Sequence, residues 1–162
     1  EYLDMSTMGI GTNILGYGHP EIDWRYTSEP APTRNGRTDY MPRGKVLGGT
    51  TSINAMSFVR GNPEDFDDWA AQGCDGWDFN SVLPYFKKSE NYEGGESEFR
   101  GVGGPLNVSP LRSPHHLTEK FLEACENAGM KRVLDYNSPP QEGIGLVQGS
   151  IKRGWRFSAS RA

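Results

Sequence analysis

Two adjacent glycines, Gly48 and Gly49, followed by three hydroxylated residues, constrain this chain more than any other short segment. Glycine lacks the Cβ that would hold a ligand away from the backbone. A Thr or Ser after such a turn caps a helix with its side-chain oxygen, and a helix start offers free N–H groups to a phosphate. The sequence therefore predicts extended chain from Arg43 to Leu47, then a turn with a candidate phosphate site, and then a helix from about Thr51 to Phe58.

Two more helices are expected directly after this segment. Residues 62–65, Asn-Pro-Glu-Asp, are typical of a helix start, because Asn caps, Pro suits the first position and acids complement the helix dipole. Gly73 should end that helix. The next helix should begin near Asn80, and Pro84 is tolerable there only if it lies in the first turn.

The remaining segments predict one helix and short strands. Apolar residues at helical spacing indicate a helix that Gly129 ends; these are Leu117, Phe121, Cys125 and Ala128. Strands are expected at Leu106–Val108 and within Ile144–Ile151. Residues 1–38 show little periodicity and should form loop, apart from an extended segment from Ile22 to Tyr26.

The composition favours a loop-rich α+β chain with an incomplete sheet. Leu, Ile, Val and Phe together make 30 of the 162 residues, whereas Gly and Pro number 21 and 11. Such a chain is expected to depend on a cofactor or on more protein for its core. The net charge of -4 argues against a nucleic-acid groove, and no apolar run reaches the length of a membrane span. Two cysteines cannot be read as a disulfide framework or as a metal site.

Two common nucleotide-binding motifs are absent from the 162 residues. No G-x-G-x-x-G occurs, since Leu106 stands where the third glycine would follow Gly101 and Gly103. Gly44-Lys45 lacks the upstream glycine of a Walker A motif. The four residues Gly48 to Thr51 on their own would therefore be only a weak sign of a cofactor.

Read together, several segments carry a family resemblance. The stretch from Pro42 to Trp69, PRGKVLGGTTSINAMSFVRGNPEDFDDW, resembles the first signature of the glucose–methanol–choline (GMC) flavoprotein oxidoreductases. Asp23-Trp24, the stretch Val59–Glu90, Gly103–Leu106 and the closing Arg156–Ser160 are also similar to that family, in its order. The likeness covers almost the whole chain and is greatest for the choline dehydrogenase and insect glucose dehydrogenase branches.

The resemblance implies a part of a GMC-type FAD/NAD(P)-binding fold. GMC enzymes carry a dinucleotide fingerprint near the N-terminus and a catalytic His near the C-terminus, and neither is found here. Residues 1–162 are therefore expected to be an internal part of an FAD-binding domain, with the remainder of the parent polypeptide as its partner. No catalytic residue is assigned within the chain, and the isolated chain is expected to be inactive.

The resemblance also assigns cofactor-binding residues. Val46 to Thr51 would lie along the diphosphate and ribityl chain of FAD, and Asn54 to Ser57 would approach the flavin ring. The assigned residues are Val46, Gly48, Gly49, Thr50, Thr51, Asn54, Ala55, Met56 and Ser57. In covalent members a His precedes the Asn; here that position is Ile53, which has no nucleophilic atom, so the FAD is expected to be non-covalent.

Other chemistry-bearing residues are interpreted as structural. His115 and His116 are adjacent at a helix start and are expected to be solvated, as is His19. The four tryptophans are expected to pack, and the acids at 64–68 to form a solvated helix face. Arg43 and Arg60 would either neutralise phosphates or make structural pairs.

The implied activity is hydride transfer from the CH–OH group of a small alcohol to flavin N5, with the base, a His, outside these residues. Two alternatives stay open on the sequence. One is an FAD-containing hydroxynitrile lyase of the same fold, and the other is a non-catalytic truncated or nicked segment. Fold-level membership does not decide between them.

Overall fold

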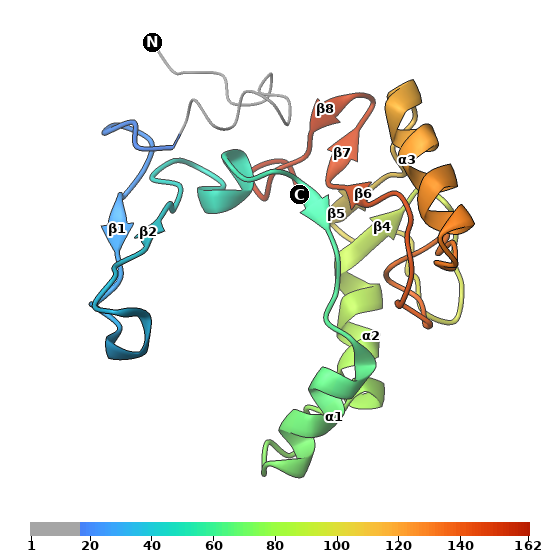
Figure 1. Cartoon of the computed structure of the whole chain (residues 1–162), viewed down its shortest axis with the longest axis horizontal. Helices are drawn as coiled ribbons and strands as arrows, with labels where there is room; N and C mark the ends of the chain where they lie inside the picture. Colours follow the sequence, from blue (N-terminus) through green and yellow to red (C-terminus); the bar gives the residue numbers. More distant parts are fainter. Residues whose placement is uncertain (1–16) are drawn as a thin grey trace. The chain divides into compact units, whose positions relative to one another are not determined.

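The computed structural model describes residues 17–162, which divide into two compact units. The first unit comprises the chain up to Met56 together with Ile151–Ala162, and the second comprises Ser57–Ser150. Every sheet in the described residues has two strands (Figure 1). The expected α+β chain with an incomplete sheet is thereby confirmed. The first part of the expected N-terminal loop, residues 1–16, lies outside the described residues.

The first unit is built on a hairpin and a small apolar core. Strand β1 (Tyr26–Thr27) pairs antiparallel with β2 (Tyr40–Met41), and a 3₁₀ turn at Pro32–Arg34 lies between them. An isolated bridge between Asp23 and Gly44 continues this pairing. Strands β7 (Ile151–Lys152) and β8 (Trp155–Arg156) form a second hairpin. The buried core contains Ile22 and Ile53, with Val46 packed against it.

The second unit contains the helices. Its elements are β3 (Ser57–Phe58), α1 (Pro63–Ala71), α2 (Phe79–Ser89), β4 (Glu90–Tyr92), β5 (Leu106–Val108), α3 (His116–Asn127) and β6 (Gln148–Gly149). Strands β3 and β6 are antiparallel, whereas β4 and β5 are parallel with Asn91 opposite Asn107. The expected strand at Leu106–Val108 is confirmed, and the expected strand after Ile144 is two short pieces.

Helix α1 forms as its start signal predicts. The Asn62 Oδ1 atom accepts a hydrogen bond from the Glu64 N–H at 3.1 Å, and the Asp65 carboxylate accepts one from the Asn62 N–H at 3.0 Å. This capping box satisfies two amide groups that the helix leaves without partners. Phe66 is the buried residue of the helix and packs edge-on against Trp69.

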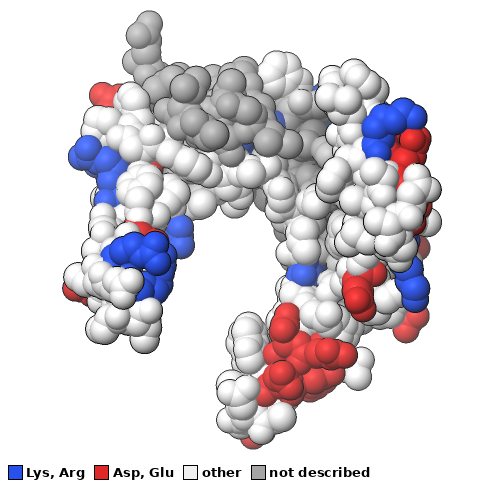
Figure 2. Space-filling model, viewed as in Figure 1, with Lys and Arg blue, Asp and Glu red and all other residues white. Residues whose placement is uncertain are grey.

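The acidic side chains of α1 gather on one surface (Figure 2). They do more than form a solvated face. Asp65 belongs to the capping box, and Asp67 Oδ1 accepts from the Phe79 N–H at 2.9 Å, at the start of α2. Asp78 caps α2 by accepting from the Ser81 N–H at 3.0 Å. Three of the acids in this region are therefore acceptors for backbone amides.

The predicted helix from Thr51 to Phe58 is wrong. Only a 3₁₀ helix, Gly49–Ser52, forms there, and strand β3 begins at Ser57. Local side chains compete with helix formation: Ser52 Oγ donates to the Leu47 carbonyl at 2.8 Å, and Asn54 Oδ1 accepts from the Met56 N–H at 2.9 Å. Met56 also has a φ of 62°, which no α-helix accepts.

The predicted start of α2 is one residue late, and the placement of Pro84 is wrong. The helix begins at Phe79, so Pro84 is its sixth residue and lies beyond the first turn. The missing N–H would have bonded to the Asn80 carbonyl. Both residues are exposed, so that carbonyl lies on the solvent side of the helix. Solvent-side carbonyls lose least when an intrahelical bond is missing, because water can bond to them.

Helix α3 forms as predicted, from His116 to Asn127, but the predicted apolar stripe is not its buried face. Leu122 is buried, whereas Leu117 and Phe121 are 62% and 65% exposed. The tryptophans also differ from expectation, because all four are about half exposed. Within residues 17–162, no helix combines the length and apolar character needed to cross a bilayer.

Candidate functional site

The Gly48–Gly49 loop lies in the first unit, and its two glycines have different surroundings. Gly48 and Gly49 both have left-handed φ values, 86° and 56°. A Cβ on Gly48 would lie 2.6 Å from Ser52 Oγ, whereas a Cβ on Gly49 would meet no described atom within 4 Å. The backbone at Gly49 is therefore bare and open on one side, which is the property that a close-approaching ligand needs.

Gly44 is a further glycine that the loop requires, and reasoning from the sequence missed it. A Cβ at Gly44 would lie 2.3 Å from the carbonyl oxygen of Gly49. The Gly44 N–H donates to Thr50 Oγ1 at 3.2 Å. Because the obstructing atoms are backbone, no side-chain movement could relieve the clash. Gly44 therefore packs directly against the backbone of Gly49 and must be a glycine for the loop to adopt this conformation.

The hydroxyl groups of the loop bond within the protein. Thr51 Oγ1 donates to the Gly48 carbonyl and accepts from the Ala159 N–H at 2.9 Å. Together with the Thr50 acceptor, these bonds hold the turn in shape. The threonine side chains therefore stabilise the turn. The phosphate site predicted at a helix N-terminus is not supported, because the 3₁₀ helix that forms here has only four residues.

Arg156 holds the other end of the loop. Its guanidinium Nη1 donates to the Thr51 carbonyl at 3.1 Å and to Asn54 Oδ1 at 3.0 Å, and the residue is 3% exposed. Burial lowers the pKa of Arg156, and the Tyr17 hydroxyl opposes that shift. A guanidinium nonetheless stays protonated in proteins. A fixed positive charge thus lies beside the loop, which favours an anion there.

The remaining predicted residues follow the loop. Asn54 is held by Arg156, Ala55 is exposed, and Met56 is buried. Ser57 is the first residue of the second unit, exposed in β3 opposite Gly149. Val46 belongs to the core of the first unit. The structure brings Gly48, Gly49, Thr50, Thr51 and Asn54 into one hydrogen-bonded segment.

Arg60, one of two candidate phosphate partners, has a structural role. It is 7% exposed, and its Nη2 donates to Glu90 Oε1 at 2.6 Å within the second unit. Arg43 is exposed, and its guanidinium donates to the Pro42 carbonyl at 2.7 Å. His115 Nδ1 accepts from the Leu117 N–H at 3.3 Å and caps α3, in keeping with its interpretation as an exposed helix start.

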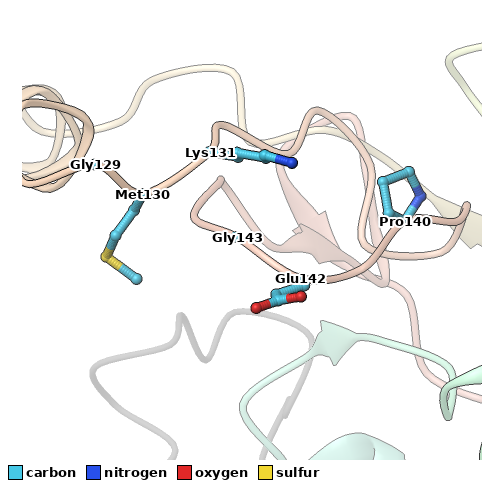
Figure 3. A pocket seen from close by; sticks show the side chains of 6 residues that line it. All are labelled: Gly129, Met130, Lys131, Pro140, Glu142 and Gly143. Carbon is cyan, nitrogen blue, oxygen red and sulfur yellow. The ribbon is translucent and has the colours of Figure 1, made fainter.

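A separate pocket of about 350 Å³ lies in the second unit (Figure 3). Its walls are Gly129, Met130, Lys131, Pro140, Glu142 and Gly143. Gly143 is required there, because a Cβ on it would lie 2.4 Å from the Lys131 carbonyl. None of the predicted site residues lines this pocket, and its charged side chains are exposed. The Gly48–Gly49 loop is therefore the stronger candidate.

Comparison with known proteins decides the family. A sequence model described as GMC oxidoreductase matches residues 7–162. The chain belongs to the GMC oxidoreductase family. An oxygen-dependent choline dehydrogenase from Sinorhizobium fredii (strain NBRC 101917 / NGR234) is 48% identical over 142 residues, which are 86% of this chain and 26% of the relative. The chain thus spans about a quarter of that relative's length.

Solved structures agree with this membership in the GMC family. Pyridoxine 4-oxidase from Mesorbium loti superposes with a TM-score of 0.86 at 28% identity, over 99% of this chain and 32% of the other. An FAD-dependent oxidoreductase from Chaetomium thermophilum gives a TM-score of 0.76 at 31% identity, over 86% of this chain and 26% of the other. The expected fold, part of a GMC FAD-binding domain, is confirmed.

Proposed function

We propose that this chain is part of the FAD-binding domain of an FAD-dependent oxidoreductase that oxidises the CH–OH group of a small alcohol. Membership of the GMC family supports the proposal. So do the choline dehydrogenase relative and the FAD-dependent structural neighbour. The single observation that carries the cofactor assignment is the open, left-handed backbone at Gly49, in a loop whose Thr51 carbonyl accepts from the buried Arg156 guanidinium.

The residues of the loop fit an FAD diphosphate. A bulky anion approaches bare backbone most closely at a glycine, and Gly49 has no described neighbour on its Cβ side. We propose that Val46 to Thr51 lie along the diphosphate and ribityl chain and that Asn54 to Ser57 approach the flavin ring. When bound, FAD supplies the hydride acceptor. The residues of this chain bind and orient it, and the base for the alcohol proton comes from outside these 162 residues.

We propose that the flavin is held without a covalent bond. Ile53 stands at the position where covalent members have a linking His. Its side chain is fully buried and packs with Ile22 in the core of the first unit. An aliphatic side chain has no nucleophilic atom that could form the link.

We also propose that residues 1–162 are an internal part of a longer GMC protein, called here the full-length protein. The small share of the relatives that the chain spans supports this division. The 162 residues alone, supplied with FAD, should therefore not turn over choline, glucose or benzyl alcohol with a dye acceptor. Turnover of any of these by the pure chain would contradict the division.

The activity can be tested on the purified full-length protein by its visible spectrum. We expect an oxidised flavin band that choline, glucose or benzyl alcohol bleaches under anaerobic conditions. Acid precipitation should release all of the yellow colour into the supernatant. A flavin that stays oxidised with every alcohol, while a cyanohydrin is cleaved, would instead identify the hydroxynitrile lyase. Colour retained in the precipitate would overturn the non-covalent assignment.

A further inference from the structure

Among the described carboxylates of the first unit, Asp23 accepts the most hydrogen bonds, and no site role was expected for it from the sequence. It is 1% exposed. Its Oδ1 atom accepts from the Arg25 N–H at 2.9 Å and from the Arg43 N–H at 3.0 Å. Its Oδ2 atom accepts from the Gly18 N–H at 2.9 Å and from the Tyr40 hydroxyl. Four donors from separate points along the chain therefore meet on one carboxylate.

These bonds fix the chain segment that enters the Gly48–Gly49 loop. Asp23 forms an antiparallel bridge with Gly44. On either side of the bridge, Trp24 donates to the Arg43 carbonyl at 2.9 Å and Lys45 donates to the Ile22 carbonyl at 2.7 Å. The Asp23 side chain adds the bond to the Arg43 N–H. The position of Gly44 is thus set by the backbone bonds of Ile22 and Trp24 and by the side-chain bond of Asp23 to Arg43.

The position of Gly44 in turn determines where Gly49 lies. The two backbones are so close that a Cβ on Gly44 would lie 2.3 Å from the Gly49 carbonyl oxygen. The Gly44 N–H also donates to Thr50 Oγ1. A shift of Gly44 by a few tenths of an ångström must therefore move Gly49 or break the bond to Thr50, because close-packed backbone transmits displacement.

We propose that Asp23 is a positioning residue for the FAD-binding loop, acting through Gly44 on Gly49. The inference rests on the proposed function of that loop. A carboxylate is needed because both of its oxygens accept, and each receives two donors. An asparagine offers one accepting oxygen and turns an NH₂ group toward the other pair of donors.

The test compares substitutions in the full-length protein. Asp23→Asn should raise the dissociation constant for FAD by at least about tenfold, since at least one buried backbone N–H loses its acceptor and the loop relaxes. Tyr40→Phe removes one donor only and should raise it by a smaller factor, about threefold. Asp39→Asn is the matched control, because Asp39 lies on the same hairpin but is half exposed and pairs with Arg34; its FAD affinity should stay within about twofold of wild type.

The measurement pairs a flavin titration of each apoprotein with its thermal unfolding, so that loss of affinity is not confused with loss of fold. Wild-type FAD affinity in Asp23→Asn would overturn the inference. If that variant does not fold, an unchanged affinity in Tyr40→Phe would overturn it. Gly49→Val serves as the reference: if it also keeps FAD, the proposed cofactor site fails. If Gly49→Val loses FAD while both Asp23→Asn and Tyr40→Phe keep it, only the role of Asp23 fails.

Discussion

Asp23 in the first unit and Glu90 in the second are both carboxylates with at most 1% exposure, but different donors surround them. Asp23 accepts from three backbone N–H groups and a tyrosine hydroxyl. Glu90 accepts from the guanidinium groups of Arg60 and Arg100 and from the Gly101 N–H. Backbone donors fix the path of the chain, whereas guanidinium donors join side chains that are distant in the sequence.

The hydrogen bonds around Glu90 show how guanidinium donors connect separate segments of the second unit. Arg100 also donates to Asp135 Oδ1 at 2.8 Å and to Gln148 Oε1 at 2.6 Å, and its guanidinium lies 3.7 Å from the Tyr92 ring centre. Burial lowers the pKa of Arg100, but its bonds to Glu90 and Asp135 outweigh that and raise the pKa overall. These contacts hold β4 to the segment around Asp135 and to β6, so the charges organise the second unit rather than a ligand site.

The comparison predicts its largest effect at Glu90. Glu90→Ala would leave two buried guanidinium groups without their shared carboxylate, and breaking a buried pair costs about 3–5 kcal/mol. Amide hydrogen exchange in β4 and β5 of the full-length protein should rise accordingly. Glu123→Ala is the control, because Glu123 is paired with Lys120 at the surface of α3 and should change exchange very little. Equal protection in both variants would contradict the view that the buried charges hold the second unit together.

The next effect is the response of the first unit to acid. Burial raises the pKa of Asp23, but the bonds from Tyr40, Gly18, Arg25 and Arg43 outweigh it and hold the pKa far below its usual value. An aspartate whose pKa is lower in the folded protein than in the unfolded chain stabilises the fold at pH values above the unfolded pKa, which is ~4. This stabilisation is lost as the pH falls below that value toward the folded pKa.

Hydrogen exchange at β1 and β2, corrected for the intrinsic rate, should therefore show protection falling as the pH drops below about 4. The variant Asp23→Asn should have less protection at neutral pH and a flatter acid dependence. A wild-type protein and an Asp23→Asn variant with parallel acid profiles would show that this carboxylate does not stabilise the hairpin in its charged form.

The smallest effect concerns Asn62, which accepts a backbone N–H at the surface as Asp23 does in the interior. Asn62→Ala removes half of the capping box and should destabilise α1 by about 1 kcal/mol. Exchange of the first amides of α1 reports the loss. Asn80→Ala is the control, since Asn80 lies in the first turn of α2 and is exposed. If the first amides of α1 exchange at the same rate in the two variants, the Asn62 cap contributes less to the stability of the helix than its geometry indicates.

The features that could be predicted from the sequence are the local ones. The start of α1 was predictable because a capping box spans four consecutive residues. The helix expected after Thr51 was wrong, because helix propensity does not report that the Ser52 and Asn54 side chains would bond to nearby backbone groups. The exposure of the apolar residues of α3 could not be predicted for another reason. Periodicity identifies an apolar stripe on a helix, but it does not report whether another element packs on that stripe.

The site was predictable in part, for the same reason. Gly48 and Gly49 stand out as neighbours, and the family resemblance located the loop around them. The role of Arg156 in stabilising the loop was missed, because Arg156 is 105 residues from Thr51 in the sequence, whose carbonyl it contacts. Gly44 was missed because its importance comes from close backbone contact with Gly49, and Asp23 because its carboxylate accepts from donors elsewhere in the chain. A pattern of residue types does not report such contacts.

The central claim, that the Gly48–Gly49 loop holds the FAD diphosphate, is tested most directly by two matched substitutions in the full-length protein. Gly49→Val and Gly36→Val both place a β-branched residue at a left-handed φ, 56° and 72°, and at neither glycine does a Cβ meet a described atom within 4 Å. Backbone strain is therefore similar at the two positions. FAD dissociation constants measured on the refolded apoproteins should rise by at least about 100-fold for Gly49→Val, the scale of a lost close contact, and stay near wild type for Gly36→Val. Equal FAD affinity in the two variants would contradict the assignment of this loop as the cofactor site.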